Sequence, residues 1–173
     1  LKDAPVHIFD TGLIDEFVLY LVNATDSSNP YISDNGLVAI GKILLLEGEK
    51  KSPSSKVEAN KPFELGEGNI KLLVGQLCKC MLKPESNSLD SRRLSLVVCR
   101  TMARFKFDEC VEPLFDLLGP SVFSCLRDTI IPIKLAAEKA YLAIFKLVEE
   151  KDMNTFNTWF SQLPAGTIQN SIG

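Results

Sequence analysis

The sequence contains few of the residues that enzymes use for proton transfer and nucleophilic attack. A single histidine, His7, occurs in 173 residues, and the G-x-S-x-G and G-x-x-x-x-G-K-[ST] patterns of serine hydrolases and nucleotide-binding loops are absent. With one histidine, most pairings of a nucleophile with a general base cannot be built. We therefore predict a protein that is not an enzyme and that uses no cofactor, metal ion or small-molecule substrate.

The chain also lacks a long apolar run and a strong net charge. No stretch of about eighteen apolar residues occurs, as a membrane-spanning helix would require, and no charged segment followed by an apolar one marks a secretory leader. The formal net charge is −3, so the molecule as a whole has no field that would attract nucleic acid. We expect no membrane contact, and the start at Leu1 rather than Met suggests a piece of a longer protein.

Cysteine is present in an odd number and in apolar surroundings. The five residues are Cys78, Cys80, Cys99, Cys110 and Cys125. This usage predicts reduced thiols buried in a core rather than a disulfide framework. Cys78 and Cys80 do not suggest a metal site, because side chains two residues apart on a helix point about 200° away from each other.

What the sequence does contain is a repeated pair of helical segments. Three predicted second helices align through Leu37–Ile40, Leu94–Val97 and Leu135–Glu138, at intervals of 57 and then 41 residues. The predicted first helices are Leu13–Val22, Asn69–Leu82 and Glu109–Leu126. The last of these should kink or split at Gly119-Pro120, and Pro132 should hold the start of the final second helix near Ile133.

Pairs of helices that recur every ~40 to 47 residues are typical of HEAT and armadillo solenoids. We predict an all-α fold, a HEAT-type α-α superhelix that spans residues 1–173 as a single domain. It should have about three repeats and a C-terminal capping helix over Met153–Leu163. The longer first interval is explained by a polar insertion, residues 48–66, whose lysines, serines and prolines predict flexibility. Ala137 and Ala140 are predicted at close contacts between helices.

A basic stripe is the candidate functional feature. Arg93, Arg100 and Arg104 are spaced seven and four residues apart and share a helix face. Arg92 extends this basic edge, and the opposite face carries the predicted core residues Leu94, Val98, Met102 and Phe105. Because second helices line the concave side of such superhelices, the stripe could contact RNA phosphate or an acidic protein. The alternative is that these arginines are solvated or pair with Glu112 and Asp116.

Three stretches of the sequence resemble a known family. They are the run CLRDTIIPIKLAAEKAYLAIFKL at 125–147, the run EEKDMNTFNTWFSQLP at 149–164, and the opening 48 residues that end in KILLLEG. Together they resemble the extreme C-terminal HEAT units of the fungal general-control non-derepressible scaffold family. Members of that family are large ribosome-bound activators of the amino-acid-starvation kinase that phosphorylates initiation factor two alpha.

The resemblance implies a cytoplasmic, non-catalytic interaction scaffold in translation control. It implies contact with translating ribosomes and with proteins that bear RWD domains, the kinase among them. No short motif here marks a binding residue of the family, so the resemblance assigns no residue a role. Period and composition alone leave a second hypothesis open, a HEAT-type solenoid of a nuclear-transport or complex-assembly protein.

Overall fold

The helices of this protein form a stack of pairs. The structure, a computed structural model of the chain, describes residues 13–50, 67–82, 87–104 and 117–151, together with 154, 157, 158 and 161. The described ranges contain no strand and comprise six helices, α1 (Leu13–Ala24), α2 (Pro30–Lys50), α3 (Glu67–Leu82), α4 (Leu89–Arg104), α6 (Gly119–Cys125) and α7 (Ile131–Lys151). The predicted all-α class is confirmed.

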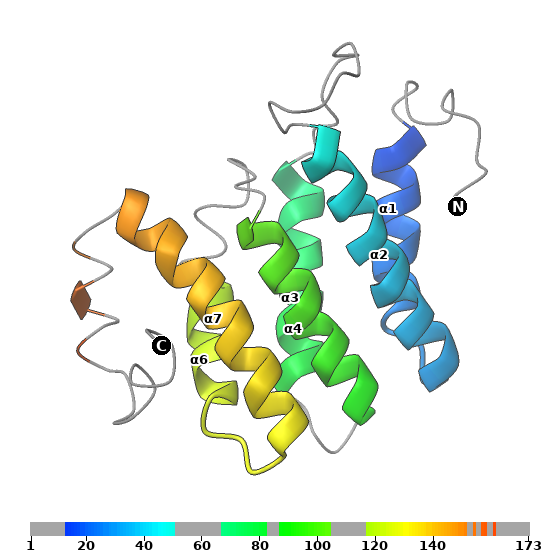
Figure 1. The fold of residues 1–173 in the computed structure, drawn as a ribbon. Coiled ribbons are helices and arrows are strands. Elements are labelled where there is room, and N and C mark those ends of the chain that lie inside the picture. Colours follow the sequence, from blue (N-terminus) through cyan, green and yellow to red (C-terminus); the bar gives the residue numbers. More distant parts are fainter. Residues whose placement is uncertain are drawn as a thin grey trace.

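Two layers make up the stack (Figure 1). Each first helix packs on its own second helix, α1 on α2, α3 on α4 and α6 on α7, and each pair forms one unit. Between units, α2, α4 and α7 pack side by side in one layer, and α1, α3 and α6 do so in the other. The three second helices run in the same direction from a common edge. This arrangement is an α-solenoid, in which each unit contacts its neighbours.

Local side-chain chemistry fixes where the second helices begin. The Asn29 side chain accepts a hydrogen bond from the Tyr31 N–H at 3.0 Å and caps α2, and Ser88 Oγ accepts the Ser91 N–H at 2.9 Å to cap α4. Such caps satisfy N–H groups that have no partner within the helix. Helix α7 begins at Ile131, two residues earlier than predicted, because Pro132 is tolerated in a first turn where its missing N–H costs nothing.

Other boundaries differ modestly from the sequence predictions. Helix α3 begins at Glu67 rather than Asn69. Helix α2 continues to Lys50 and so includes the first three residues of the predicted insertion 48–66. The rest of that insertion lies outside the described residues, so its flexibility stays a prediction. Of the predicted cap Met153–Leu163, the structure describes four helical positions, 154, 157, 158 and 161.

The predicted kink or split at Gly119-Pro120 stays a prediction, because the residues before Leu117 lie outside the described part of the chain. Helix α6 begins at Gly119 with Pro120 in its first turn, and a wider π-type turn at Leu117 and Leu118 precedes it. The earlier part of the predicted helix, residues 109–116, lies outside the described part of the chain, as do Glu112 and Asp116. The proposed pairing of the arginines with those two carboxylates therefore stays a hypothesis.

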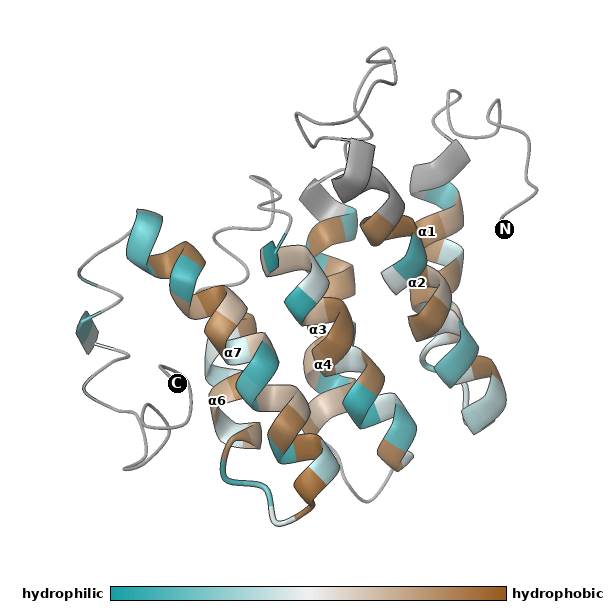
Figure 2. Cartoon of the chain, in the orientation of Figure 1, coloured by the Kyte–Doolittle hydropathy of each residue, from teal (hydrophilic) through white to brown (hydrophobic). Residues whose placement is uncertain are grey.

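A continuous apolar core fills the space between the layers. Hydrophobic residues occupy the facing sides of the helices, while hydrophilic residues are interspersed on the outer surface (Figure 2). Ala137 and Ala140 are both 0% exposed, as their predicted place at helix contacts requires. Helices α1 and α2 approach closely at Gly36, where an added Cβ would lie 3.1 Å from Thr25 Cγ2. Small residues thus set the spacing of neighbouring helices.

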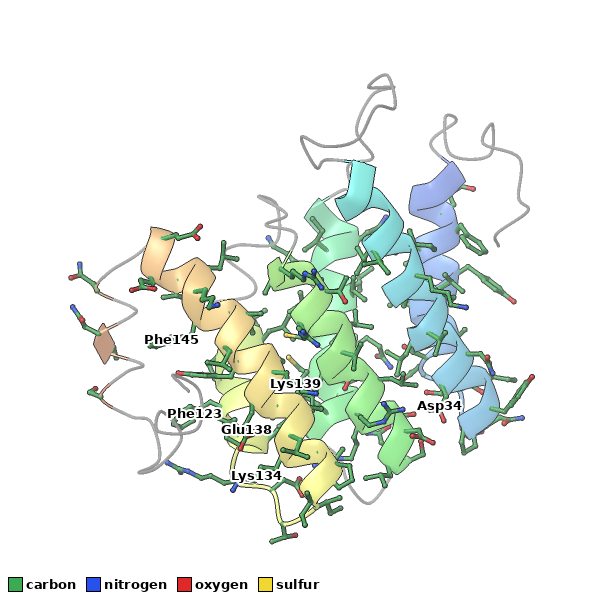
Figure 3. The ribbon with its side chains drawn as sticks, viewed as in Figure 1. Asp34, Phe123, Lys134, Glu138, Lys139 and Phe145 are labelled. Atoms are coloured by element: carbon green, nitrogen blue, oxygen red, sulfur yellow. The ribbon has the colours of Figure 1, made fainter. Side chains whose placement is uncertain are left out.

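Polar side chains join the first unit to the second. The carboxylate of Asp34 on α2 accepts hydrogen bonds from Ser91 Oγ and, at 3.2 Å, from Ser88 Oγ, both at the start of α4 (Figure 3). Gln76 Nε2 on α3 donates to Asp26 in the turn after α1 at 3.2 Å. These hydroxyl and amide groups supply hydrogen bonds to the carboxylates of Asp34 and Asp26 at the edge of the core.

Four of the five cysteines fall within the described residues, and all four are free thiols. Cys80, Cys99 and Cys125 are buried and Cys78 is half-buried, so the predicted core usage is confirmed for them. Cys110 lies outside the described residues. Burial raises the pKa of Cys80 and of Cys125 to about 11 and raises the pKa of Cys99 further still.

These raised pKa values predict slow thiol chemistry in the folded protein. Because the thiolate is the reactive form, Cys80, Cys99 and Cys125 should be alkylated by iodoacetamide at pH 7 far more slowly in the native chain than in urea. Cys78, which is less buried, should react first of the four. Peptide-level mass spectrometry measures each site separately, and native labelling of Cys99 at the unfolded rate would contradict its burial.

Candidate partner-binding surface

Helix α4 presents two opposite faces. Its inner face is buried and contains Ser91, Arg92, Ser95, Leu96, Val98, Cys99, Met102 and Ala103. Its outer face carries Arg93, Val97, Arg100 and Arg104, which are exposed and spaced three or four residues apart. The predicted core residues Val98 and Met102 are buried, Leu94 is half-buried, and Phe105 lies outside the described residues. Three of the four candidate arginines therefore lie on the outer surface.

Arg92 is the exception, and its predicted place on the basic edge is wrong. Its side chain is 6% exposed and forms an ion pair with Asp128, whose side chain is 15% exposed. Arg92 Nε also donates to the backbone carbonyl of Met81, near the end of α3, at 3.1 Å. A cation at a helix C-terminus is favoured by the helix dipole. Arg92 thus ties the end of α3 to the turn between α6 and α7 and is not available to a partner.

Asp128 is held in its charged form by these contacts. Burial by itself would raise its pKa, but the Ile130 N–H, which donates to Asp128 Oδ1 at 2.8 Å, and the Arg92 guanidinium outweigh that effect. The pKa of Asp128 therefore lies below its ordinary value. This ion pair is the joint between the second and third units.

A basic groove lies between α4 and α7. It has a volume of about 370 Å³ and is lined by Arg100, Ala103 and Arg104 of α4 and by Lys139, Leu142, Ala143, Lys146, Leu147 and Glu150 of α7. Four of these nine residues are cations and one is a carboxylate. Figure 3 shows Lys139 on the side of α7 that faces α4. The groove therefore offers positive charge above an apolar floor.

The sequence prediction missed the two lysines of this groove. Lys139 and Lys146 are seven residues apart on α7 and share a face, just as Arg93 and Arg100 do on α4. That spacing was visible in the sequence. What the sequence did not show was that α7 packs beside α4, which brings the two basic faces to one groove.

An apolar groove lies on the other side of α4. It has a volume of about 210 Å³ and is lined by Leu37, Val38, Gly41, Lys42 and Leu45 of α2 and by Leu94, Val97, Val98 and Thr101 of α4. Lys42 is the one charged residue among these lining positions. The outer face of α4 is thus a ridge between the basic groove and the apolar groove.

Within the described residues, no group of three histidine, cysteine or acidic side chains is placed to hold a metal ion. The helices that the structure describes are all too short or too polar to cross a bilayer. The features that remain on the outer layer are the ridge and its two grooves.

Comparison with known proteins identifies the repeat type. The family described as GCN1-like, C-terminal HEAT repeats matches residues 1–155. The chain belongs to this family. The GCN1-like assignment confirms both the HEAT-type solenoid predicted from the helix pairs and the resemblance found in the sequence.

A curated relative of this GCN1-like chain is the "eIF-2-alpha kinase activator GCN1" of Saccharomyces cerevisiae. The two are 65% identical over 163 residues, which is 94% of this chain but 6% of the relative. The chain therefore spans a small part of that protein's length. No solved structure matches the chain.

Proposed function

We propose that this chain is a scaffold segment of an eIF-2-alpha kinase activator and that it acts by binding partners rather than by catalysis. The observation that carries the proposal is the outer surface of α2, α4 and α7, where exposed arginines, lysines and apolar side chains line two grooves. The name of the GCN1-like relative, a kinase activator, supports the same role. A solenoid suits it because its units create an extended surface for partners.

The partners follow from the family resemblance. We infer a cytoplasmic protein that associates with ribosomes and with the RWD-domain proteins of the starvation-kinase pathway. Arg93, Arg100 and Arg104 stay candidate contact residues on this surface, whereas Arg92 supports the fold. The second hypothesis, a nuclear-transport or complex-assembly solenoid, is disfavoured because the chain matches a family of GCN1-like repeats across residues 1–155.

A segment exchange in Saccharomyces cerevisiae tests this function. We expect the relative to retain activation of its kinase when this chain replaces its matching C-terminal segment, because 65% identity preserves the fold. Deletion of the segment should reduce phosphorylation of eIF-2-alpha during amino-acid starvation. The measurement is a phospho-specific immunoblot, with the abundance of the activator as the control. Full activation after deletion would contradict the proposal.

A further inference from the structure

We propose that the two grooves beside α4 together bind an acidic segment of a partner protein, in which carboxylates and apolar side chains share one face. The inference rests on the proposed scaffold function and names the partner's chemistry. The basic groove would receive the carboxylates, and the apolar groove, together with the floor of the basic one, would receive the apolar side chains.

The charges of the basic groove support an anionic partner. In the part of the chain that the structure describes, Arg100, Lys139 and Lys146 take part in no ion pair, although all three line one groove. Arg93 differs, because its guanidinium lies 3.4 Å from the carboxylate of Asp90. Like charges around a shared groove repel one another. Carboxylates placed among them would relieve that repulsion and would orient the partner.

The apolar side chains of the grooves support a protein partner. Val97 is 42% exposed, Leu45 is 39% exposed and Leu142 is 37% exposed, and each lines one of the two grooves. Burying such side chains against a partner is favourable, whereas leaving them in water is not. A partner that carried negative charge alone would leave this surface exposed.

The spacing of the ridge suits a helical segment. Along α4, Val97 and Thr101 face the apolar groove while Arg100 and Arg104 face the basic one, so both kinds of contact recur every four residues. An amphipathic helix that docks in a groove presents anchors at the same three- and four-residue spacing. At about 370 Å³ and 210 Å³, the grooves have room for individual side chains.

RNA fits the same surface less well. Proteins that bind single-stranded RNA stack its bases on aromatic side chains, and none of the described residues that line either groove is aromatic. The exposed Tyr20 and Tyr31 lie on α1 and at the start of α2, outside both grooves.

The test is a fluorescence-anisotropy titration of this chain with three labelled probes. The first is a synthetic helical peptide of about sixteen residues with leucines at three- and four-residue spacing and glutamates beside them. The second has glutamine in place of each glutamate. The third is single-stranded oligouridine. We expect the acidic peptide to bind best, with an affinity that falls as salt rises.

Groove variants locate the binding site. The triple variant Arg100→Gln, Lys139→Gln, Lys146→Gln should weaken binding of the acidic peptide about tenfold, because each exposed charge pair contributes modestly. Leu142→Ser should weaken it by a few fold through lost apolar contact. Two matched controls lie outside the grooves, Lys134→Gln, an exposed cation on α7, and Leu72→Ser, an exposed apolar residue on α3. Both should leave the affinity unchanged, and all variants should keep the native melting temperature.

Several outcomes would overturn the inference. If oligouridine bound more tightly than the acidic peptide, and if the triple variant lost that binding, the surface would be an RNA site. Equal binding of the glutamine peptide would show that charge plays no part, and absence of peptide binding would show that the grooves accept no such segment. The segment exchange tests the scaffold function separately from the grooves. Loss of kinase activation on deletion would uphold that function even if no peptide bound.

Discussion

Replacing Arg92 by alanine should lower the free energy of unfolding by about 1 to 3 kcal/mol, because two acceptors at the edge of the core lose a charged hydrogen-bond donor. The two acceptors are the carboxylate of Asp128, which keeps its hydrogen bond from the Ile130 N–H, and the Met81 carbonyl. Urea unfolding followed by circular dichroism measures the change. Arg93→Ala is the matched control, since Arg93 is exposed and its loss should cost less than about 1 kcal/mol.

The pH dependence of stability distinguishes this ion pair from simple packing. A carboxylate whose pKa is lower in the folded state stabilises the protein above its unfolded pKa, about 3.9 for aspartate, and that stability is lost as the pH falls through the folded value. The native chain should therefore lose the contribution of Asp128 only below about pH 4. In Arg92→Ala the folded-state pKa of Asp128 should lie closer to the unfolded value, so less stability should be lost over the same acidic range. Parallel stability curves for the two proteins would show that Arg92 acts through packing alone.

Replacing Ala140 by leucine should destabilise the chain by about 1 to 3 kcal/mol, because extra methylene groups in a filled core force neighbouring side chains and helices apart. Ala140 is 0% exposed on α7, the helix that packs against both α4 and α6. The melting temperature should fall by roughly 2 to 4 °C per kcal/mol for a chain of this size.

Glu149→Leu is the control for the alanine prediction. Glu149 is exposed on the same helix, so leucine there adds the same side chain without overpacking the core. Its melting temperature should stay close to the native value. If Ala140→Leu melts at the native temperature as well, the contact between α7 and its neighbours has space that the structure does not show.

The neighbours Arg92 and Arg93 show how far the sequence predicts this surface. Helical spacing groups Arg93 with Arg100 and Arg104, and the structure places all three outside. The same spacing groups Arg92 with Leu96, Cys99 and Ala103, which are buried. The prediction placed Arg92 on the exposed edge because of its charge, since a buried arginine is expected only where an acidic partner can pair with it. That partner, Asp128, is 36 residues away and could not be inferred from α4 alone.

The fold was more predictable than the site because it depends on repetition. Each helix pair has its own apolar spacing and its own turn, so the class follows from local patterns. The basic groove depends instead on which helices become neighbours. Lys139 and Lys146 join Arg100 only because α7 packs beside α4, and that neighbour relation is a property of the stacked units, not of either helix.

The position of α4 between α2 and α7 has a consequence for how this segment can change. Both grooves and the joint to the third unit depend on how α4 is rotated about its own axis. Loss of one residue near Ser88 would turn every later side chain by about 100°, which would take Arg92 away from Asp128 and the outer arginines away from the basic groove. The rotational phase of α4 is therefore fixed from both sides.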